Sequence, residues 1–274
     1  MNANRLGIEY LSVFGLPPVE FVRLAADLGV GYISTGLTAM PLDSLGYPPF
    51  SLRNDAGLRH ELRKVMDDTG GVRISLGEGF LVIPGADCRD FASDLDVMCE
   101  LGVPRINTLG LDPDRPRTFD QFASLTELAA ERGMRTTLEM MPGSVVGDLE
   151  AAVDAVRHVG RPEFQLLVDT MHLARSGAGA DDLRALDHGV IGYAQLSDNP
   201  VIDSMEDYLV AATFERMVPG TGILPLADIL EALPADVHIG LEVPIRSQAE
   251  AGVGPHERLR PPCVAAARAL LPGG

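Results

Sequence analysis

The chain of 274 residues contains a single lysine, Lys64, and no tryptophan. Lys64 lies in a polar run that we expect on a helix surface, so an enzyme that forms a Schiff base has a poor candidate here. The phosphate-binding pattern G-x-x-x-x-G-K-[ST] is absent, and no G-x-G-x-x-G follows the first expected strand. Aromatic residues make up 5% of the chain, so extended stacking surfaces for nucleic-acid bases are not expected.

Cysteine is also sparse. The three cysteines form no C-x-x-C pair, and an odd, small number indicates a reducing compartment rather than a disulfide framework. The first residues lack the apolar core of a signal peptide. No segment has the run of about 18 apolar residues that a membrane-spanning helix needs. We therefore expect a cytoplasmic protein.

Positive charge is scarce compared with negative charge. The chain has 39 acidic residues against 22 lysines and arginines, which gives a formal net charge of −17. Nucleic acids and anionic membranes attract basic surfaces, so neither is an expected partner. The expected partner is a small molecule, a sugar or polyhydroxy ketone, and self-association into a homo-oligomer is left open.

Short apolar runs alternate with amphipathic stretches along the whole sequence. The expected strands are residues 5–14, 32–36, 72–76, 105–109, 135–139, 164–169, 189–196 and 237–242. The expected helices are residues 18–28, 51–69, 88–101, 118–132, 146–159, 181–186, 226–233 and 257–271. Eight strands that each precede a helix predict an α/β fold, a (β/α)8 TIM barrel formed by a single domain over residues 1–274. An open doubly wound sheet is the alternative.

Two of the connections that follow strands are long. They span residues 37–50 and 197–224, and both would stand at the face where barrel enzymes hold their active sites. Long loops in compact domains often act as lids or binding loops, although surface decoration remains an alternative.

Polar residues end the last four expected strands. Glu139, Asp169, Gln195 and Glu242 would converge from neighbouring strands at the mouth of the barrel. Three carboxylates in one low-dielectric site repel each other and raise each other's pKa unless a cation neutralises them. A single divalent metal resolves this repulsion, and hard oxygen ligands suit Mg²⁺ or Mn²⁺.

The runs around these residues resemble the sugar phosphate isomerase/epimerase superfamily, the xylose isomerase-like TIM barrels. The matching runs are Thr137-Leu138-Glu139, Val168-Asp169-Thr170-Met171-His172, Gln195-Leu196-Ser197-Asp198-Asn199-Pro200 and Leu241-Glu242-Val243-Pro244. The resemblance implies that Glu139, Asp169, Gln195 and Glu242 ligate the metal. It also implies that His172 contacts the substrate near that metal.

The sequence departs from the usual family pattern at Gln195, where histidine is common. An amide oxygen is a harder ligand and favours Mn²⁺ or Mg²⁺, while Co²⁺ and Zn²⁺ remain possible. Members that resemble 3-dehydroshikimate dehydratase and inosose dehydratase also carry glutamine there. The segment Arg216-Met217-Val218-Pro219-Gly220-Thr221-Gly222 looks like the one whose arginine holds substrate in those enzymes.

Enzymes of this family remove a proton from the carbon next to a carbonyl, and a metal stabilises the enolate. The resemblance implies that Glu139 and Glu242 act as base and acid, with His172 assisting. Further substrate contacts are expected from Arg216, Glu78 and Asp198, although Asp198 could instead orient a loop. The expected activity is isomerisation or epimerisation of a sugar or related hydroxy ketone. Dehydration of a cyclic polyhydroxy ketone and a catalytically silent sugar-binding barrel are the alternatives.

Overall fold

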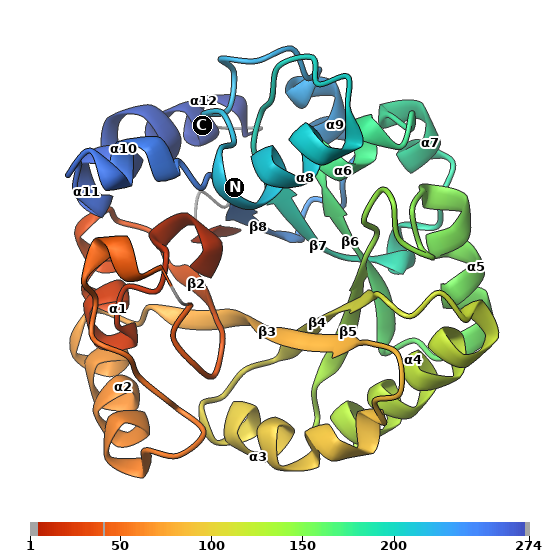
Figure 1. The fold of residues 1–274 in the computed structure, drawn as a ribbon, viewed down its shortest axis with the longest axis horizontal. Helices are drawn as coiled ribbons and strands as arrows, with labels where there is room; N and C mark the ends of the chain where they lie inside the picture. Colours follow the sequence, from red (N-terminus) through yellow and green to blue (C-terminus); the bar gives the residue numbers. More distant parts are fainter. Residues whose placement is uncertain (1–4, 41, 272–274) are drawn as a thin grey trace.

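Eight parallel strands form a closed barrel in the computed structural model, which describes residues 5–40 and 42–271. Neighbouring strands pair in sequence order, and β8 pairs with β1 to close the barrel. The helices surround the strands as an outer ring (Figure 1). The expected (β/α)8 barrel is therefore confirmed. The strands are β1 (Leu6–Ile8), β2 (Tyr32–Thr35), β3 (Arg73–Val82), β4 (Arg105–Gly110), β5 (Arg135–Glu139), β6 (Phe164–Asp169), β7 (Ile191–Leu196) and β8 (His238–Leu241).

The helices follow the expected order, with additional short helices. They are α1 (Pro18–Asp27), α2 (Ala56–Asp68), α3 (Ala92–Glu100), α4 (Arg115–Ala130), α5 (Leu149–Val159), α6 (Thr170–Arg175), α7 (Ala180–Arg184), α8 (Met205–Phe214), α9 (Leu226–Ala232), α10 (Arg246–Glu250), α11 (Pro255–Leu259) and α12 (Ala265–Leu270). The expected last helix, residues 257–271, is instead divided into α11, a π-helical turn and α12. Two consecutive prolines within Arg260–Val264 lack the N–H groups that a continuous helix needs.

Aspartate side chains set the start of several helices. The carboxylate of Asp114 accepts a hydrogen bond from the backbone N–H of Arg117, at 3.1 Å, so α4 begins before the expected threonine cap. Thr118 lies inside the helix, where its hydroxyl donates to the Asp112 carbonyl. Asp55 caps α2 in the same way, so that helix begins later than expected.

The first expected strand, residues 5–14, was too long. β1 ends at Ile8, and a 3-10 helix follows at Tyr10–Val13. The Ser12 hydroxyl donates to the Leu241 carbonyl and accepts from the Val243 N–H, each at 2.8 Å. These contacts with the end of β8 turn the chain across the barrel instead of extending the strand.

β3, in contrast, is twice the expected length. Its pairing register with β4 shifts between Gly77 and Phe80, which is the signature of a β-bulge. Glu78 lies in this bulge, within the strand rather than beyond it. Gly79 has φ +98°, a backbone conformation that side chains disfavour, and so allows the bulge.

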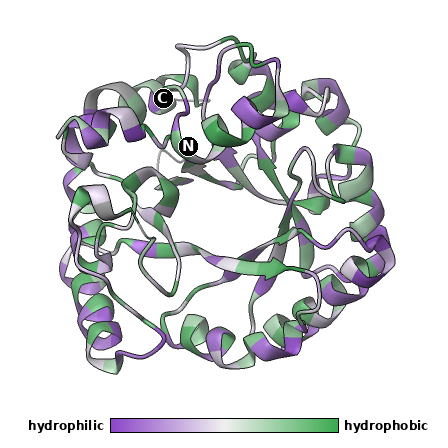
Figure 2. Ribbon diagram, viewed as in Figure 1, coloured by the Kyte–Doolittle hydropathy of each residue, from purple (hydrophilic) through white to green (hydrophobic). Residues whose placement is uncertain are grey.

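Buried apolar side chains form three clusters. The large one packs the strands against the helices, and the two small ones consist of Leu76, Leu167 and Tyr193, and of Met171, Tyr208 and Ala212. β6 and β7 are buried at every residue, as expected for strands covered on both faces. Figure 2 shows hydrophobic residues along the strands and polar residues on the outer helix faces. Within the described residues, no helix has the length and apolar character to cross a membrane.

Candidate active site at the carboxyl end of the barrel

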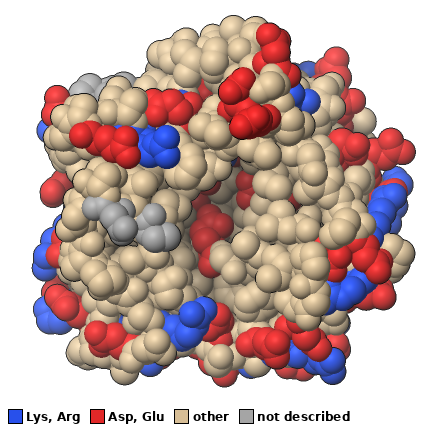
Figure 3. Space-filling model, in the orientation of Figure 1, with Lys and Arg blue, Asp and Glu red and all other residues tan. Residues whose placement is uncertain are grey.

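The four predicted metal ligands lie at the same end of adjacent strands. Glu139 and Asp169 are the last residues of β5 and β6, Gln195 lies one residue before the end of β7, and Glu242 follows β8 directly. All four are buried. Asp169 and Gln195 are paired residues of neighbouring strands. Figure 3 shows acidic side chains within the central depression of the face viewed there.

Two side chains, from Asn107 and His172, hold Glu139 in place. Asn107 of β4 donates from Nδ2 to Glu139 Oε2 at 2.6 Å. His172 Nε2 lies 3.3 Å from Glu139 Oε1. His172 Nδ1 lies 2.5 Å from the hydroxyl of Tyr208 on α8, which fixes the orientation of the imidazole ring.

Asp169 uses its two oxygens for different purposes. Oδ1 accepts from the backbone N–H groups of Met171 and His172, at 2.7 and 3.0 Å, and so caps α6. Oδ2 forms an ion pair with Arg216. The helix cap places His172 one turn beyond the strand end, next to Glu139.

Arg216 connects Asp169 to Glu242. Its second terminal nitrogen lies 2.6 Å from Glu242 Oε2, while Nε donates to the Ala212 carbonyl at 2.7 Å. Gln195 Nε2 donates to the other Glu242 oxygen at 3.2 Å. The buried guanidinium is therefore the cation that pairs with these two carboxylates in the structure.

Several atoms of this cluster are suited to a metal ion. Glu139, Asp169 and His172 each present a ligand atom, and these atoms lie within 4.8 Å of one another. The buried Gln195 Oε1 has no hydrogen-bond donor among the described residues. A buried acceptor without a donor is energetically costly, and a bound cation would satisfy it.

A second group of carboxyls lies beside the first. The hydroxyl of Tyr193 donates to Glu9 Oε1 at 2.8 Å, and the other Glu9 oxygen is buried without a donor among the described residues. Glu9 lies over Gly240 of β8, where a Cβ atom would approach Glu9 Oε1 to 1.4 Å. Glu78 approaches from the bulge of β3. Glycine at position 240 therefore makes room for a carboxyl group inside the barrel.

The crowding of acidic groups shifts their pKa values. Burial raises the pKa of Glu78 well above its ordinary value, and the charges of Glu9 and Glu139 add to this. Burial also raises the pKa of Glu242, with Arg216 acting in the opposite direction. Burial would raise the pKa of Asp169 too, but Arg216 and His172 hold it below its ordinary value.

Asp198 is engaged with its own loop. Its carboxylate accepts from the backbone N–H groups of Asn199, Gly220, Gly222 and Leu224, at 2.9 to 3.0 Å. The sequence left two roles open for Asp198, contact with the substrate and orientation of a loop. These hydrogen bonds support the second role. The loop held in this way is the one that carries Arg216.

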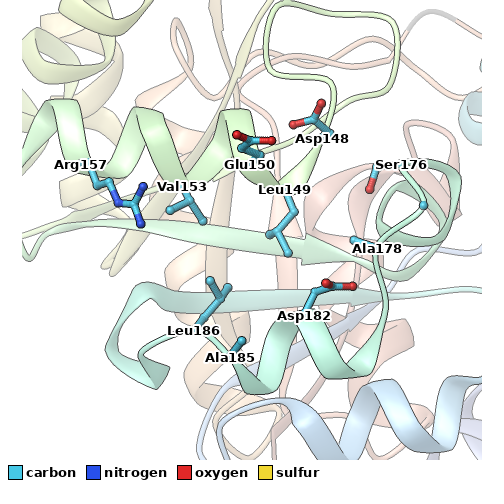
Figure 4. Close-up of a pocket in the computed structure, with 11 residues that line it drawn as sticks. Asp148, Leu149, Glu150, Val153, Arg157, Ser176, Ala178, Asp182, Ala185 and Leu186 are labelled. Carbon is cyan, nitrogen blue, oxygen red and sulfur yellow. The ribbon is translucent and has the colours of Figure 1, made fainter.

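The two long loops contribute to the mouth in different ways. The first lines a cavity of about 340 Å³ beside Glu78 and Tyr10 through residues such as Leu37 and Met40. The second contains α8, which the sequence did not predict, and supplies Tyr208. Figure 4 shows another cavity, about 510 Å³, between α5 and α7. None of the predicted site residues lines that outer cavity.

Sequence reasoning missed two residues that contact the site. Asn107 could have been found from its place in a buried strand, because a polar side chain there must have a partner. Tyr208 gives no comparable signal, since it comes from a segment expected to be a loop.

The chain belongs to the xylose isomerase-like TIM barrel family, whose model matches residues 22–260. Among curated proteins, it is 27% identical over 215 residues to the Streptomyces coelicolor protein named "Putative hydroxypyruvate isomerase". The match covers 66% of this chain and 72% of that relative. The family resemblance inferred from the sequence is thereby confirmed.

Two solved structures share the fold. The IolI protein with a bound zinc atom has a TM-score of 0.75 at 18% identity, with 97% of this chain and 95% of that chain covered. The structure described as the probable 3-DHS dehydratase AsbF from Bacillus anthracis has a TM-score of 0.72 at 15% identity, with 93% and 97% covered. At these identities, the likeness shows that the three chains share the barrel fold.

Proposed function

We propose that this chain is a divalent-metal-dependent isomerase or epimerase of a sugar or related hydroxy ketone. The observation that carries the proposal is the convergence of Glu139, Asp169, Gln195 and Glu242 at one end of β5–β8. The family membership supports an enzymatic role, and the relative named as a hydroxypyruvate isomerase supports isomerisation over other outcomes.

The donor set fits a hard divalent cation such as Mn²⁺ or Mg²⁺. Glu139, Asp169, Gln195 and Glu242 would hold it, and the buried Gln195 Oε1, which has no donor among the described residues, supports this. The zinc of the IolI structure keeps Zn²⁺, and with it Co²⁺, among the candidates. When bound, the metal polarises the carbonyl and adjacent hydroxyl of the substrate.

Glu139 is the proposed base. Its carboxylate is held by Asn107 at 2.6 Å and faces His172 at 3.3 Å, so it cannot rotate freely away from the mouth. Glu242 enters from β8, three strands further around the barrel, and is the proposed acid that returns the proton. A substrate carbon between β5 and β8 is then accessible to both groups, as proton transfer requires.

His172 and Arg216 are the proposed substrate contacts nearest these groups. When the Tyr208 hydroxyl donates to Nδ1, Nε2 of His172 carries the ring proton and can donate it to a substrate oxygen. Arg216 must exchange part of its pairing with Asp169 and Glu242 for a substrate oxygen. Glu78 is the proposed contact for a substrate hydroxyl, and Asp198 holds the loop that positions Arg216.

Exchange of the substrate α-proton tests the proposal. The protein is treated with chelator, and Mg²⁺, Mn²⁺, Co²⁺ or Zn²⁺ is added back. Exchange in D₂O is then followed by NMR with ketoses, hydroxypyruvate, inososes and 3-dehydroshikimate. We expect metal-dependent exchange and an isomerised product with one substrate group. Loss of water from the substrate would instead establish dehydration. Absence of exchange across the panel with every metal would favour the catalytically silent barrel.

A further inference from the structure

The opposite, amino-terminal end of the barrel contains a cavity of about 670 Å³. Its lining includes residues at the beginnings of five consecutive strands: Arg105 of β4, Arg135 of β5, Gln165 of β6, Gly192 of β7 and His238 of β8. The cavity therefore lies at the far end of the strands from Glu139 and Asp169. Two arginines, Arg105 and Arg135, line this cavity in a chain with a net charge of −17.

Neutral groups, rather than carboxylates, hold both arginines. Arg105 donates to the Gly192 carbonyl, and its guanidinium lies 5.6 Å from the centre of the Tyr193 ring. Its Nε is buried with no acceptor among the described residues. Arg135 donates to Gln165 Oε1 at 3.2 Å. Across residues 5–40 and 42–271, neither arginine forms an ion pair.

The positions of these partners show that the arrangement is built into the barrel. Gln165 Nε2 donates to the Gly189 carbonyl at 2.8 Å, which leaves Oε1 oriented to receive Arg135. A Cβ atom on Gly192 would approach Gln165 Oε1 to 2.7 Å. Because Gly192 has no side chain, there is room for Gln165, and Gln165 in turn orients Arg135.

Other arginines at this end have a different function. Arg73 donates to the Met66 carbonyl of α2, and Arg268 donates to the Gly29 carbonyl just beyond α1. Such contacts satisfy carbonyls at helix carboxyl ends. Among the described residues, Arg105 and Arg135 donate to no helix end, so capping does not account for their charge.

The positive charge affects the neighbouring histidine. Burial and then the charge of Arg105 lower the pKa of His238 to about 4, with Arg5 acting in the same direction and Asp236 opposing. Asp236 also lines the cavity, but it is exposed to solvent. Asp236 forms no ion pair with Arg105 or Arg135 among the described residues, and a buried positive charge without an ion pair favours the binding of an anion.

We propose that the cavity bounded by Arg105, Arg135 and His238 binds a small oxyanion, with phosphate or carboxylate oxygens, at a site separate from the proposed active site. The Arg135 guanidinium offers the two parallel donors that match such oxygens, and Arg105 Nε offers a further donor. The cavity, of about 670 Å³, also has the exposed carboxylate of Asp236 in its lining, whose negative charge would repel highly charged polyanions.

Titration calorimetry of the whole protein tests this site, with inorganic phosphate and malonate as probes and sodium chloride at matched ionic strength as control. We expect saturable binding of at least one probe. Arg135→Met should weaken it about tenfold, the effect of losing a charge-assisted pair of hydrogen bonds. The matched control is Arg157→Met, which removes an exposed arginine of α5 and should bind as the unmodified protein does.

NMR of the histidine rings provides a second readout. An anion beside His238 should raise the pKa of that ring from about 4, while the exposed His60 of α2 should not respond. Saturable binding that Arg135→Met leaves unchanged, or that leaves His238 unaffected, would overturn the proposal. So would the absence of saturable binding of both probes.

Discussion

The two ends of the barrel carry opposite charge and compensate it differently. At the carboxyl end, acidic groups crowd together, and Arg216 pairs with two of them. At the amino end, Arg105 and Arg135 are held by a backbone carbonyl and an amide. Arg216 therefore pairs with charged groups, whereas Arg105 and Arg135 form no ion pair among the described residues. This difference in pairing is the basis of the two proposals, a cation site at the mouth and an anion site at the amino-terminal end.

Glycine has the same function at both ends. Gly240 leaves space for Glu9 at the mouth, and Gly192 leaves space for Gln165 at the amino-terminal end of the barrel. In each case, a polar side chain from one strand occupies the volume of an absent side chain on another. Side-chain size on a partner strand therefore decides where these polar groups point.

Tyr193 connects the two ends through the interior of the barrel. Its hydroxyl donates to Glu9 at 2.8 Å, and its ring lies 5.6 Å from the Arg105 guanidinium. Burial and the charge of Glu9 raise the pKa of this tyrosine well above its ordinary value, so the phenol stays neutral. A neutral, fully buried residue separates the acidic end from the basic end.

The largest effect should come from removing the proposed acid and base. We expect Glu139→Gln and Glu242→Gln each to lower kcat by at least about 100-fold, because general acid–base catalysis contributes 10²–10⁴-fold. Steady-state kinetics on the substrate identified by proton exchange measures this. Glu131→Gln removes an exposed carboxylate and should have no effect. Retention of more than about a tenth of the activity in both variants would argue against these roles.

An intermediate effect is expected from removing Arg216, the buried arginine at the mouth of the barrel. Arg216→Met leaves Asp169 and Glu242 buried without their partner, and this should lower the free energy of unfolding by about 3 kcal/mol. Urea unfolding of the metal-free protein measures the loss, and added Mn²⁺ should recover more stability in the variant than in the unmodified protein.

The control for this change is Arg89→Met, which removes an exposed arginine paired with Asp87. Exposed pairs contribute about 0–1 kcal/mol, so little change is expected. Equal stability of Arg216→Met and the unmodified protein would show that the mouth does not depend on an internal cation.

The smallest effect concerns the pH dependence of stability that arises from His238, at the amino-terminal end of the barrel. The unfolded chain binds a proton at His238 below about pH 6.5, while the folded protein does so only near pH 4. The contribution of neutral His238 to the free energy of unfolding is therefore fully present above pH 6.5 and is lost as the pH falls toward 4. His238→Gln should therefore flatten the decline of Tm over this interval, compared with His60→Gln. Parallel declines in the two variants would contradict the assigned pKa.

The order of the elements followed from periodicity, but several boundaries did not. Asp114 starts α4 earlier than the sequence indicated, because a cap is decided by hydrogen-bond geometry. β1 ends early because Ser12 bonds to the distant Leu241, and β3 continues through a bulge around Glu78. Such long-range contacts have no local signature. The single domain over residues 1–274, the homo-oligomer and the cytoplasmic location stay predictions.

The candidate site was predicted in part. Strand ends identified Glu139, Asp169, Gln195 and Glu242 because parallel strands bring their carboxyl ends to one face. The sequence did not show that Arg216 lies between Asp169 and Glu242. Its position depends on the path of a long loop held by backbone contacts to Asp198.

The amino-acid sequence alone determined the class of fold and the strand ends that carry acidic groups, because alternation of apolar and polar residues is a local property. The tertiary structure alone decided which charges meet and which are left without a partner. Arg216 and Arg105 are the same residue type, yet one pairs with two carboxylates and the other with a carbonyl. The physical reason is that compensation of a buried charge depends on what distant strands and loops place within a few ångströms of it.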